Sequence, residues 1–108
     1  MTTAQEKMQQ AQAKLSAHAD RLRSIGAVYK FVLEGEGGGT WIAKFRDEPA
    51  IEEGDGDAEC TIIMAASDYV DMLEDRANPQ QLFFTGKLKV EGDMGLAMKL
   101  GDIADIMK

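Results

Sequence analysis

The stretch AVYKFVLEGEGGGTWIAKFR, residues 27–46, decides the fold class. Large apolar side chains share one face of each half when every second residue is taken: Tyr29, Phe31 and Leu33, then Trp41, Ala43 and Phe45. A period of two is typical of strands that bury one face of a sheet. The glycine-rich segment between the two halves therefore predicts the turn of a β-hairpin.

The three glycines at 37–39 are also the kind of sequence found in phosphate-binding loops. Such a loop continues into Gly-Lys-Ser/Thr and then into a helix. Here that sequence does not follow, and the next element is expected to be a strand. We therefore favour a flexible hairpin turn over a phosphate site.

Before the hairpin, apolar residues recur at helical spacing from Met8 to Ile25, and Gly26 is the glycine expected just past a helix end. This pattern predicts one long amphipathic helix over residues 3–25. His18 falls on or near the apolar stripe. Because no metal-ligating residue lies three or four positions away, we interpret it as a boundary residue rather than a metal ligand.

After the hairpin, AIEE at 50–53 and CTIIMA at 60–65 predict two further strands, joined by the acidic turn GDGDAE. Asp55, Asp57 and Glu59 have the alternate spacing of a calcium loop. The glycine expected next and the distant glutamate are missing, so a solvated turn is favoured. Cys60 is interpreted as a small buried hydrophobic residue, and a reactive thiol at this position is the alternative.

Residues 67–86 predict two helices, the first capped by Ser67 and the second capped by Asn78 with Pro79 at its first position. Gly86 ends the second helix, KLKVEG forms a last strand, and Asp93 caps a final helix over residues 94–107. The order of elements predicts an α+β fold, with one mostly antiparallel sheet covered by helices on a single face. We expect a single domain over residues 1–108.

Composition limits the classes of function that the protein can have. Hydrophobic residues make up 44% and charged residues 29% of the chain, a balance typical of a globular domain rather than a disordered one. The net charge of −7, with no cluster of basic residues, disfavours nucleic acid and anionic membranes as partners and leaves at most transient membrane contact. No signal peptide and no apolar stretch of membrane-spanning length is found, so a cytoplasmic protein is expected.

The stretch FFTGKLKVEGDMGLAMKL, residues 83–100, is rich in apolar side chains and glycine. On a helical wheel Leu96, Leu100, Ile103 and Met107 form one stripe, while Met94 and Met98 lie on a nearly opposite one. Methionine is flexible and polarisable and suits a surface that adapts to an apolar guest. The alternative is that both stripes belong to the core.

Residues 58–100, AECTIIMAASDYVDMLEDRANPQQLFFTGKLKVEGDMGLAMKL, strongly resemble the signature half of the sterol carrier protein 2 family. The shared features are the acidic-Cys-Thr strand, the Ser-Asp-aromatic helix, Asn-Pro-Gln, Phe-Phe and Gly-Lys-Leu-Lys. The most specific is the closing motif GDMGLAMKL. The N-terminal half agrees more loosely, in the Ile25-Gly26 step, the aromatic strand and the Thr40-Trp41 strand.

The resemblance implies a five-stranded sheet with helices on one side that encloses a hydrophobic tunnel between the layers. It implies binding of fatty acid, fatty acyl-CoA, other lipids or sterols, with no cofactor and no catalytic residue. The positions that it implies as tunnel lining are Phe31, Leu33, Trp41, Phe45, Ile62, Met64, Phe83, Phe84, Met94, Leu96, Met98, Leu100 and Ile103.

The chain departs from animal members of the family because it ends in DIMK rather than in a peroxisomal address. This departure favours a free-standing bacterial member that carries acyl chains or a quinone rather than a peroxisomal sterol carrier. The expected function is non-enzymatic lipid carriage. The alternatives are a ligand-free scaffold module and an accessory factor for lipid or quinone biosynthesis.

Gly86 and Gly92 bracket the last predicted strand. Gly86 is expected in the left-handed conformation, where a Cβ atom costs roughly 1 to 2 kcal/mol. We therefore expect Gly86→Val to destabilise the domain. Gly92→Ala, at the entry to the last helix, is expected to lower stability only modestly and to alter the rate of ligand release.

Overall fold

The computed structural model describes residues 3–46 and 48–107. In chain order the elements are α1 Ala4–Lys14, the 3-10 helix Ser16–His18, α2 Ala19–Ile25, β1 Val28–Glu34, β2 Gly39–Lys44, β3 Ala50–Glu53, β4 Cys60–Ala65, α3 Ala66–Leu73, α4 Pro79–Phe84, β5 Leu88–Gly92, α5 Met94–Ala97 and α6 Leu100–Met107. The predicted α+β class is confirmed.

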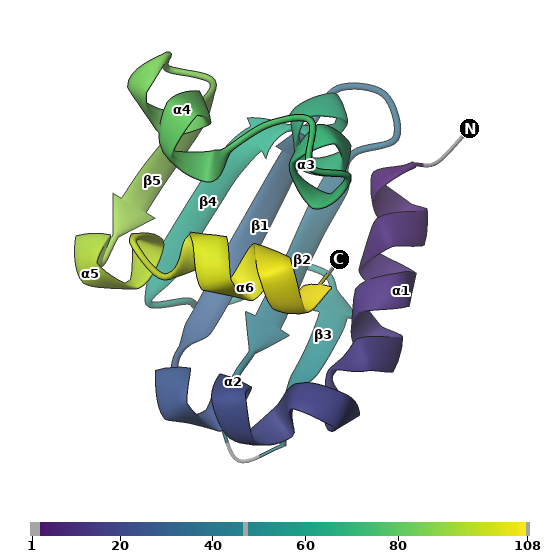
Figure 1. The fold of residues 1–108 in the computed structure, drawn as a ribbon, viewed down its shortest axis with the longest axis vertical. Coiled ribbons are helices and arrows are strands. Elements are labelled where there is room, and N and C mark those ends of the chain that lie inside the picture. Colours follow the sequence, from purple (N-terminus) through teal and green to yellow (C-terminus); the bar gives the residue numbers. More distant parts are fainter. Residues whose placement is uncertain (1–2, 47, 108) are drawn as a thin grey trace.

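The five strands form one sheet in the order β3-β2-β1-β4-β5. β1 and β4 run parallel, and the other three neighbouring pairs are antiparallel, so the sheet is mostly antiparallel as expected. Figure 1 shows α1, α3 and α6 on one face of the sheet, with α2 at one end of it and α4 and α5 beside β5. This two-layer arrangement leaves β5 and the short helices around it at one edge of the domain.

The core lies between the sheet and α1, α3 and α6. Alternation in β1 buries Tyr29, Phe31 and Leu33 fully, and the parallel register sets Phe31 beside the equally buried Ile62 of β4. The ring of Tyr69 in α3 lies 6.1 Å from that of Phe31, centroid to centroid, at a tilted angle favourable for aromatic pairs. These contacts fix the helical layer over the centre of the sheet.

The predicted N-terminal helix over residues 3–25 is wrong in one respect, because the helix is broken. A 3-10 segment at Ser16–His18 separates α1, which packs on α3 and α6, from α2, which lies at the end of the sheet. Leu15 and Leu22 flank the break and are both buried. Their seven-residue spacing is compatible with a continuous helix, so periodicity alone does not reveal the change of direction.

The start of α3 also differs from the prediction. The helix begins at Ala66, and the N-cap position is Ala65, which has no side-chain hydrogen bond to the helix. Ser67 is therefore not the cap. The reason is that β4 runs directly into α3, so that Ala65 is still extended backbone of the strand. The cap predicted for α4 is confirmed, since the Asn78 side chain accepts a 2.8 Å hydrogen bond from the Gln80 amide.

The predicted final helix over residues 94–107 is divided into α5 and α6. Asp93 caps α5 as expected. At the break, the Leu96 carbonyl accepts the Lys99 N–H at 3.1 Å and the hydroxyl of Tyr29 at 2.7 Å. The i→i+3 bond from Lys99 to Leu96 marks a tight turn at residues 98 and 99, between α5 and α6.

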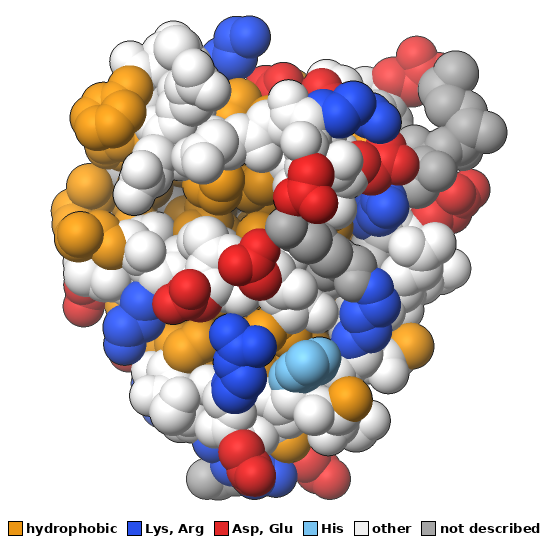
Figure 2. All heavy atoms as spheres, viewed as in Figure 1, with side chains coloured by type: hydrophobic (Ala, Val, Ile, Leu, Met, Phe, Trp, Pro, Cys, Tyr) orange, Lys and Arg blue, Asp and Glu red, His pale blue; other side chains and the backbone are white. Residues whose placement is uncertain are grey.

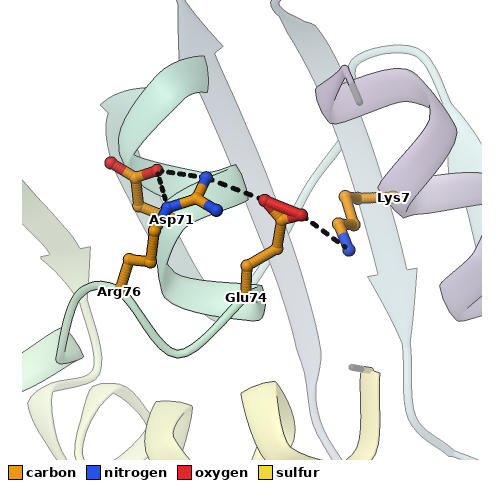
Figure 3. Close-up of polar contacts among 4 residues, drawn as sticks. All are labelled: Lys7, Asp71, Glu74 and Arg76. Atoms are coloured by element: carbon orange, nitrogen blue, oxygen red, sulfur yellow. Dashed lines mark hydrogen bonds and ion pairs between the residues drawn. The ribbon is translucent and has the colours of Figure 1, made fainter. Parts of the chain in front are cut away.

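Charged side chains connect α3, the loop after it and α1. Figure 3 shows Arg76 bridging Asp71 at 2.8 Å and Glu74 at 2.7 Å, while Glu74 also lies 3.7 Å from Lys7 of α1. Each of these ion pairs is partly exposed and contributes at most about 1 kcal/mol. Together they hold the end of α3 next to α1, where the chain turns toward α4.

The acidic turn before β4 forms ion pairs rather than a cluster. Asp55 accepts a 2.7 Å bond from Lys30, which lowers the pKa of that carboxyl, and Glu59 pairs with Arg46. Within the described residues there is no group of three or more His, Cys, Asp or Glu side chains placed to hold a metal ion. Asp55 and Glu59 are thus each engaged by a basic side chain.

The left-handed backbone expected at Gly86 is confirmed, whereas the expectation that Gly92 accepts a side chain at modest cost is not supported. Both have positive φ, +79° at Gly86 and +97° at Gly92. An added Cβ at Gly86 would have no neighbour within 4 Å, whereas at Gly92 it would lie 2.5 Å from the backbone oxygen of Glu59. Of these two glycines, the structure therefore identifies Gly92 as the one that tolerates a side chain less.

None of the helices in the described part of the chain combines the length and the apolar character needed to cross a membrane.

Candidate functional site

An apolar pocket of about 560 Å³ lies where α4, β5, α5 and the start of α6 meet. Figure 2 shows hydrophobic side chains in and around a hollow on this face, between the positions that α4 and α5 have in Figure 1. The pocket is lined by Asn78, Pro79, Gln80, Phe83, Phe84, Leu88, Val90, Met94, Ala97, Met98, Leu100 and Gly101. Its volume is in the range of roughly 300–1,000 Å³ common for small-molecule sites.

The wall formed by α4 is fixed by hydrogen bonds at both ends of this short helix. Asn78 caps its beginning, and at its end the Lys87 amide donates to the Leu82 carbonyl at 2.9 Å and the Gly86 amide to the Phe83 carbonyl at 3.1 Å. Leu82 is buried under the helix. The two residues that follow Leu82, Phe83 and Phe84, therefore lie at the rim of the pocket.

The floor and the opposite wall come from the last strand and the divided helix. Leu88 and Val90 alternate on the side of β5 that carries the pocket, and Leu100 closes it from α6. Met94 and Ala97 of α5 and Met98 just after it also line the pocket, and α5 is tied to β1 through the Tyr29 hydroxyl.

Large hydrophobic side chains remain exposed at this pocket. Among the described residues the exposed large hydrophobic side chains are Phe83 at 41%, Phe84 at 83%, Met94 at 50% and Met98 at 85%, and all four line the pocket. The rings of Phe83 and Phe84 lie edge to face with centroids 6.1 Å apart. A concentrated apolar surface of this kind marks a binding site more often than chance exposure does.

The electrostatic character of the pocket is neutral. Among the described lining residues no side chain is acidic or basic, and only Asn78 and Gln80 have polar side chains. The site has the shape and polarity of a binding site for a hydrocarbon chain, with two amides at its edge. Such a lining offers no group for general acid or base catalysis.

Cys60, the residue of the thiol alternative, does not line the pocket. It is fully buried at the start of β4, and burial, with a smaller effect of the nearby Asp93 carboxylate, raises the pKa of its thiol to about 11. Reactive cysteines have lowered pKa values and solvent access. The geometry favours a structural role for this residue.

The structure brings together five of the residues expected to contact a ligand. Phe83, Phe84, Met94, Met98 and Leu100 line the pocket. The others lie elsewhere: Leu96 is partly buried against the core, and the fully buried core contains Phe31, Leu33, Trp41, Phe45, Ile62, Met64 and Ile103. These eight residues do not line this pocket, and a tunnel that reaches them stays a prediction.

Sequence reasoning missed seven lining residues: Asn78, Pro79, Gln80, Leu88, Val90, Ala97 and Gly101. Alternation in KLKVEG puts Leu88 and Val90 on one face of the last strand, but alternation does not tell a face that lines a pocket from one that packs on the core. Asn78 and Pro79 carried only a capping signal. Their role in the pocket depends on how α4 folds back beside β5, which no local pattern encodes.

Comparison with known proteins identifies relatives over nearly the whole chain. Residues 6–105 match the model of the SCP-2 sterol transfer family. The chain is 40% identical to human sterol carrier protein 2 over 87 residues, which is 76% of this chain. The match spans only 16% of the length of the human protein.

Solved structures show the same fold. The chain superimposes on apo sterol carrier protein 2 from Yarrowia lipolytica with a TM-score of 0.82 and 23% identity, covering 94% of this chain and 89% of that one. It also matches sterol carrier protein 2 from Aedes aegypti in complex with the C16 fatty acid palmitate, with a TM-score of 0.69 and 23% identity, over 94% and 97% of the two chains.

Proposed function

Because the chain belongs to the SCP-2 sterol transfer family, we propose that it is a non-enzymatic lipid carrier that binds the hydrocarbon chain of its ligand in the pocket between α4, β5, α5 and α6. The observation that carries this proposal is the gathering of Phe83, Phe84, Met94 and Met98, all exposed, around one apolar pocket. Exposure of this apolar surface to water costs free energy, and an apolar ligand would remove that cost by covering it.

The energetics are compatible with reversible carriage. Burial of hydrocarbon contributes about 0.8 kcal/mol per methylene, so roughly ten methylenes correspond to micromolar affinity before the cost of association is counted. A longer chain is needed once that cost is included. A fatty acid or fatty acyl-CoA of ordinary length meets this requirement, and the palmitate held by the Aedes aegypti protein supports this class of ligand.

The flexible methionines suit chains of different shape. Met94 begins α5 and Met98 follows its last residue, and the backbone of this helix is held by Asp93 and Tyr29, so that adaptation is confined to unbranched side chains on a fixed support. Loading and release would take place by transient contact with a membrane or with a partner protein. The site is open enough for this exchange because Phe84 and Met98 are more than four-fifths exposed.

The experiment is a titration of the protein with a fluorescent fatty acid, repeated with Met98→Glu. The variant should bind at least about ten-fold more weakly, since a carboxylate replaces an apolar side chain at the pocket. Its free energy of unfolding should change by no more than about 0.5 kcal/mol, because Met98 is 85% exposed. Gln81→Glu adds the same charge on an exposed residue of α4 outside the lining and should bind normally.

Absence of saturable binding by the unmodified protein would support the alternative of a scaffold module with a solid core. Equal loss of affinity in Met98→Glu and Gln81→Glu would place the ligand elsewhere in the domain. A marked loss of stability in Met98→Glu would show that this side chain belongs to the core rather than to a binding surface.

A further inference from the structure

The α4 wall of the pocket has little packing of its own. This short helix supplies four lining residues, Pro79, Gln80, Phe83 and Phe84. Of its residues, all of which the structure describes, Leu82 is the buried one. A helix of this length is not stable in isolation. Its position beside β5 therefore depends on how the chain is fixed at its two ends.

Arg76 fixes the loop that leads into α4. Its backbone N–H donates to the Asp71 carbonyl at 2.8 Å, and its guanidinium donates to the Asp71 carboxylate at 2.8 and 3.1 Å. Asp71 belongs to α3, which packs on the core through Val70 and Leu73. The chain is thus attached to a firmly packed helix only two residues before Asn78, the cap of α4.

The same loop contains a residue in the left-handed conformation. Asp75 has a φ of +62°, and it is the one non-glycine residue with positive φ in the described part of the chain. Residues with a Cβ rarely adopt this backbone, which persists where surrounding contacts hold it. The 2.7 Å ion pair between Arg76 and Glu74 spans Asp75, and Glu74 also lies 3.7 Å from Lys7 of α1 (Figure 3). Partly exposed ion pairs therefore close the loop and connect it to α1.

We propose that Arg76 is a positioning residue of the lipid pocket: it holds the loop before α4 against α3 and so fixes the α4 wall around the ligand. Arg76 does not line the pocket, so its effect reaches the ligand through α4. When its ion pairs break, α4 moves away from β5 and α6 more readily, and the ligand leaves faster. Because the Arg76 side chain is 58% exposed, salt screens these pairs, and ionic strength then controls the rate of release. This inference rests on the proposed function and names a residue that regulates it.

The experiment measures release of a fluorescent fatty acid from the full chain after rapid mixing with excess unlabelled palmitate. Arg76→Gln removes the charge and should release the probe about three- to five-fold faster, the size expected when partly exposed ion pairs are lost. Lys44→Gln is the matched control. It removes the same charge and breaks the exposed pair with Glu52, at the β2–β3 side of the sheet and away from β5. This variant should release the probe at the rate of the unmodified protein.

Salt and a conservative variant separate the ion pairs from a general loss of packing. Between about 0.05 M and about 0.5 M NaCl, the release rate of the unmodified protein should approach that of Arg76→Gln, because the pairs are screened. Other effects of salt act on all the proteins and cancel in the ratio of rates. Arg76→Lys keeps the charge without the two-pronged guanidinium and should restore the slow release only in part.

Hydrogen exchange without ligand tests the α4 wall directly. The amides of α4 should exchange several-fold faster in Arg76→Gln than in Lys44→Gln, while those of α3 exchange alike in both. Release from Arg76→Gln at the rate of the unmodified protein, with the probe bound by both, would overturn the inference and leave the lipid carrier standing. A ratio of rates that does not change with salt would show that the ion pairs do not hold α4. If the unmodified protein does not bind the probe, the proposed function fails and the inference falls with it.

Discussion

Replacement of Gly92 by alanine should be among the most damaging single-methyl changes in this domain. Gly92 pairs with Cys60 in the β4–β5 register, and the following residue, Asp93, donates its N–H to the Glu59 carbonyl at 3.0 Å. A Cβ at Gly92 would lie 2.5 Å from that same oxygen and 3.3 Å from its carbon. The two strands would have to separate at the point where the chain enters α5.

The expected magnitude has two parts. Left-handed backbone with a Cβ costs about 1 to 2 kcal/mol, and an unavoidable overlap in a packed region adds about 1 to 3 kcal/mol. Gly92→Ala should therefore lower the free energy of unfolding by about 2 to 5 kcal/mol. Gly86→Ala should lower it by about 1 to 2 kcal/mol, since φ is +79° but no atom lies within 4 Å of the new Cβ.

Urea denaturation of both variants beside the unmodified protein measures the difference. The entropy that alanine removes from the unfolded chain is common to the two variants, so their comparison isolates the contact with Glu59. In thermal unfolding each kcal/mol corresponds to roughly 4–8 °C for a domain of about this size. Equal destabilisation by Gly86→Ala and Gly92→Ala would refute the reasoning, because it would mean that the backbone at Gly92 moves away from the Glu59 carbonyl at no cost in free energy.

Asn78→Ala should lower the free energy of unfolding by about 1 kcal/mol because α4 loses its cap, and an unchanged urea midpoint would contradict this. Tyr29→Phe should cost about 1 kcal/mol and speed amide exchange in α5, since the hydroxyl bond to Leu96 is lost; exchange at the rate of the unmodified protein would argue against that role of the bond. The thiol of Cys60 has a pKa near 9 unfolded and about 11 folded, so stability should be constant below pH 9 and fall as pH rises toward 11. Denaturation across this pH range with Cys60→Ala, which should show a shallower fall, tests the assignment.

Local sequence patterns were enough to predict which face of a strand is buried, but not which strands lie side by side in the sheet. The alternation of Tyr29, Phe31 and Leu33 identified the buried side of β1, because burial of one face is a property of the strand itself. The parallel pairing of β1 with β4 is different, since it joins segments about 30 residues apart and depends on how the helices cover the sheet. Nothing in either strand alone specifies it.

The two broken helices illustrate the same limit. Periodicity continues across each break, as the buried pair Leu15 and Leu22 shows for the first. The second break is associated with a hydroxyl from β1 that bonds the Leu96 carbonyl across 67 residues of sequence. A helical wheel still separated Met94 and Met98 from Leu100, because side-chain direction within a turn or two is set locally.

The candidate site was predictable where side chains are both apolar and exposed. Phe83, Phe84, Met94 and Met98 stand out in sequence because they break the usual pattern of a small acidic domain. The floor formed by Leu88 and Val90 was not distinguishable from ordinary strand packing. Whether a residue on the inner side of a sheet contacts a ligand or another side chain depends on the width of the space opposite it.

The rim of the pocket is built partly from thioethers, and this gives it a chemistry that leucine or phenylalanine would not have. Met98 is 85% and Met94 50% exposed, whereas Met8, Met64, Met72 and Met107 are shielded in the core. Oxidants convert accessible methionine to its sulfoxide, a polar and chiral group that reductases can restore. Among the methionines that the structure describes, peroxidised lipid in the pocket would thus reach Met94 and Met98 before those of the core, so oxidation would alter the rim of the pocket before the packing of the domain.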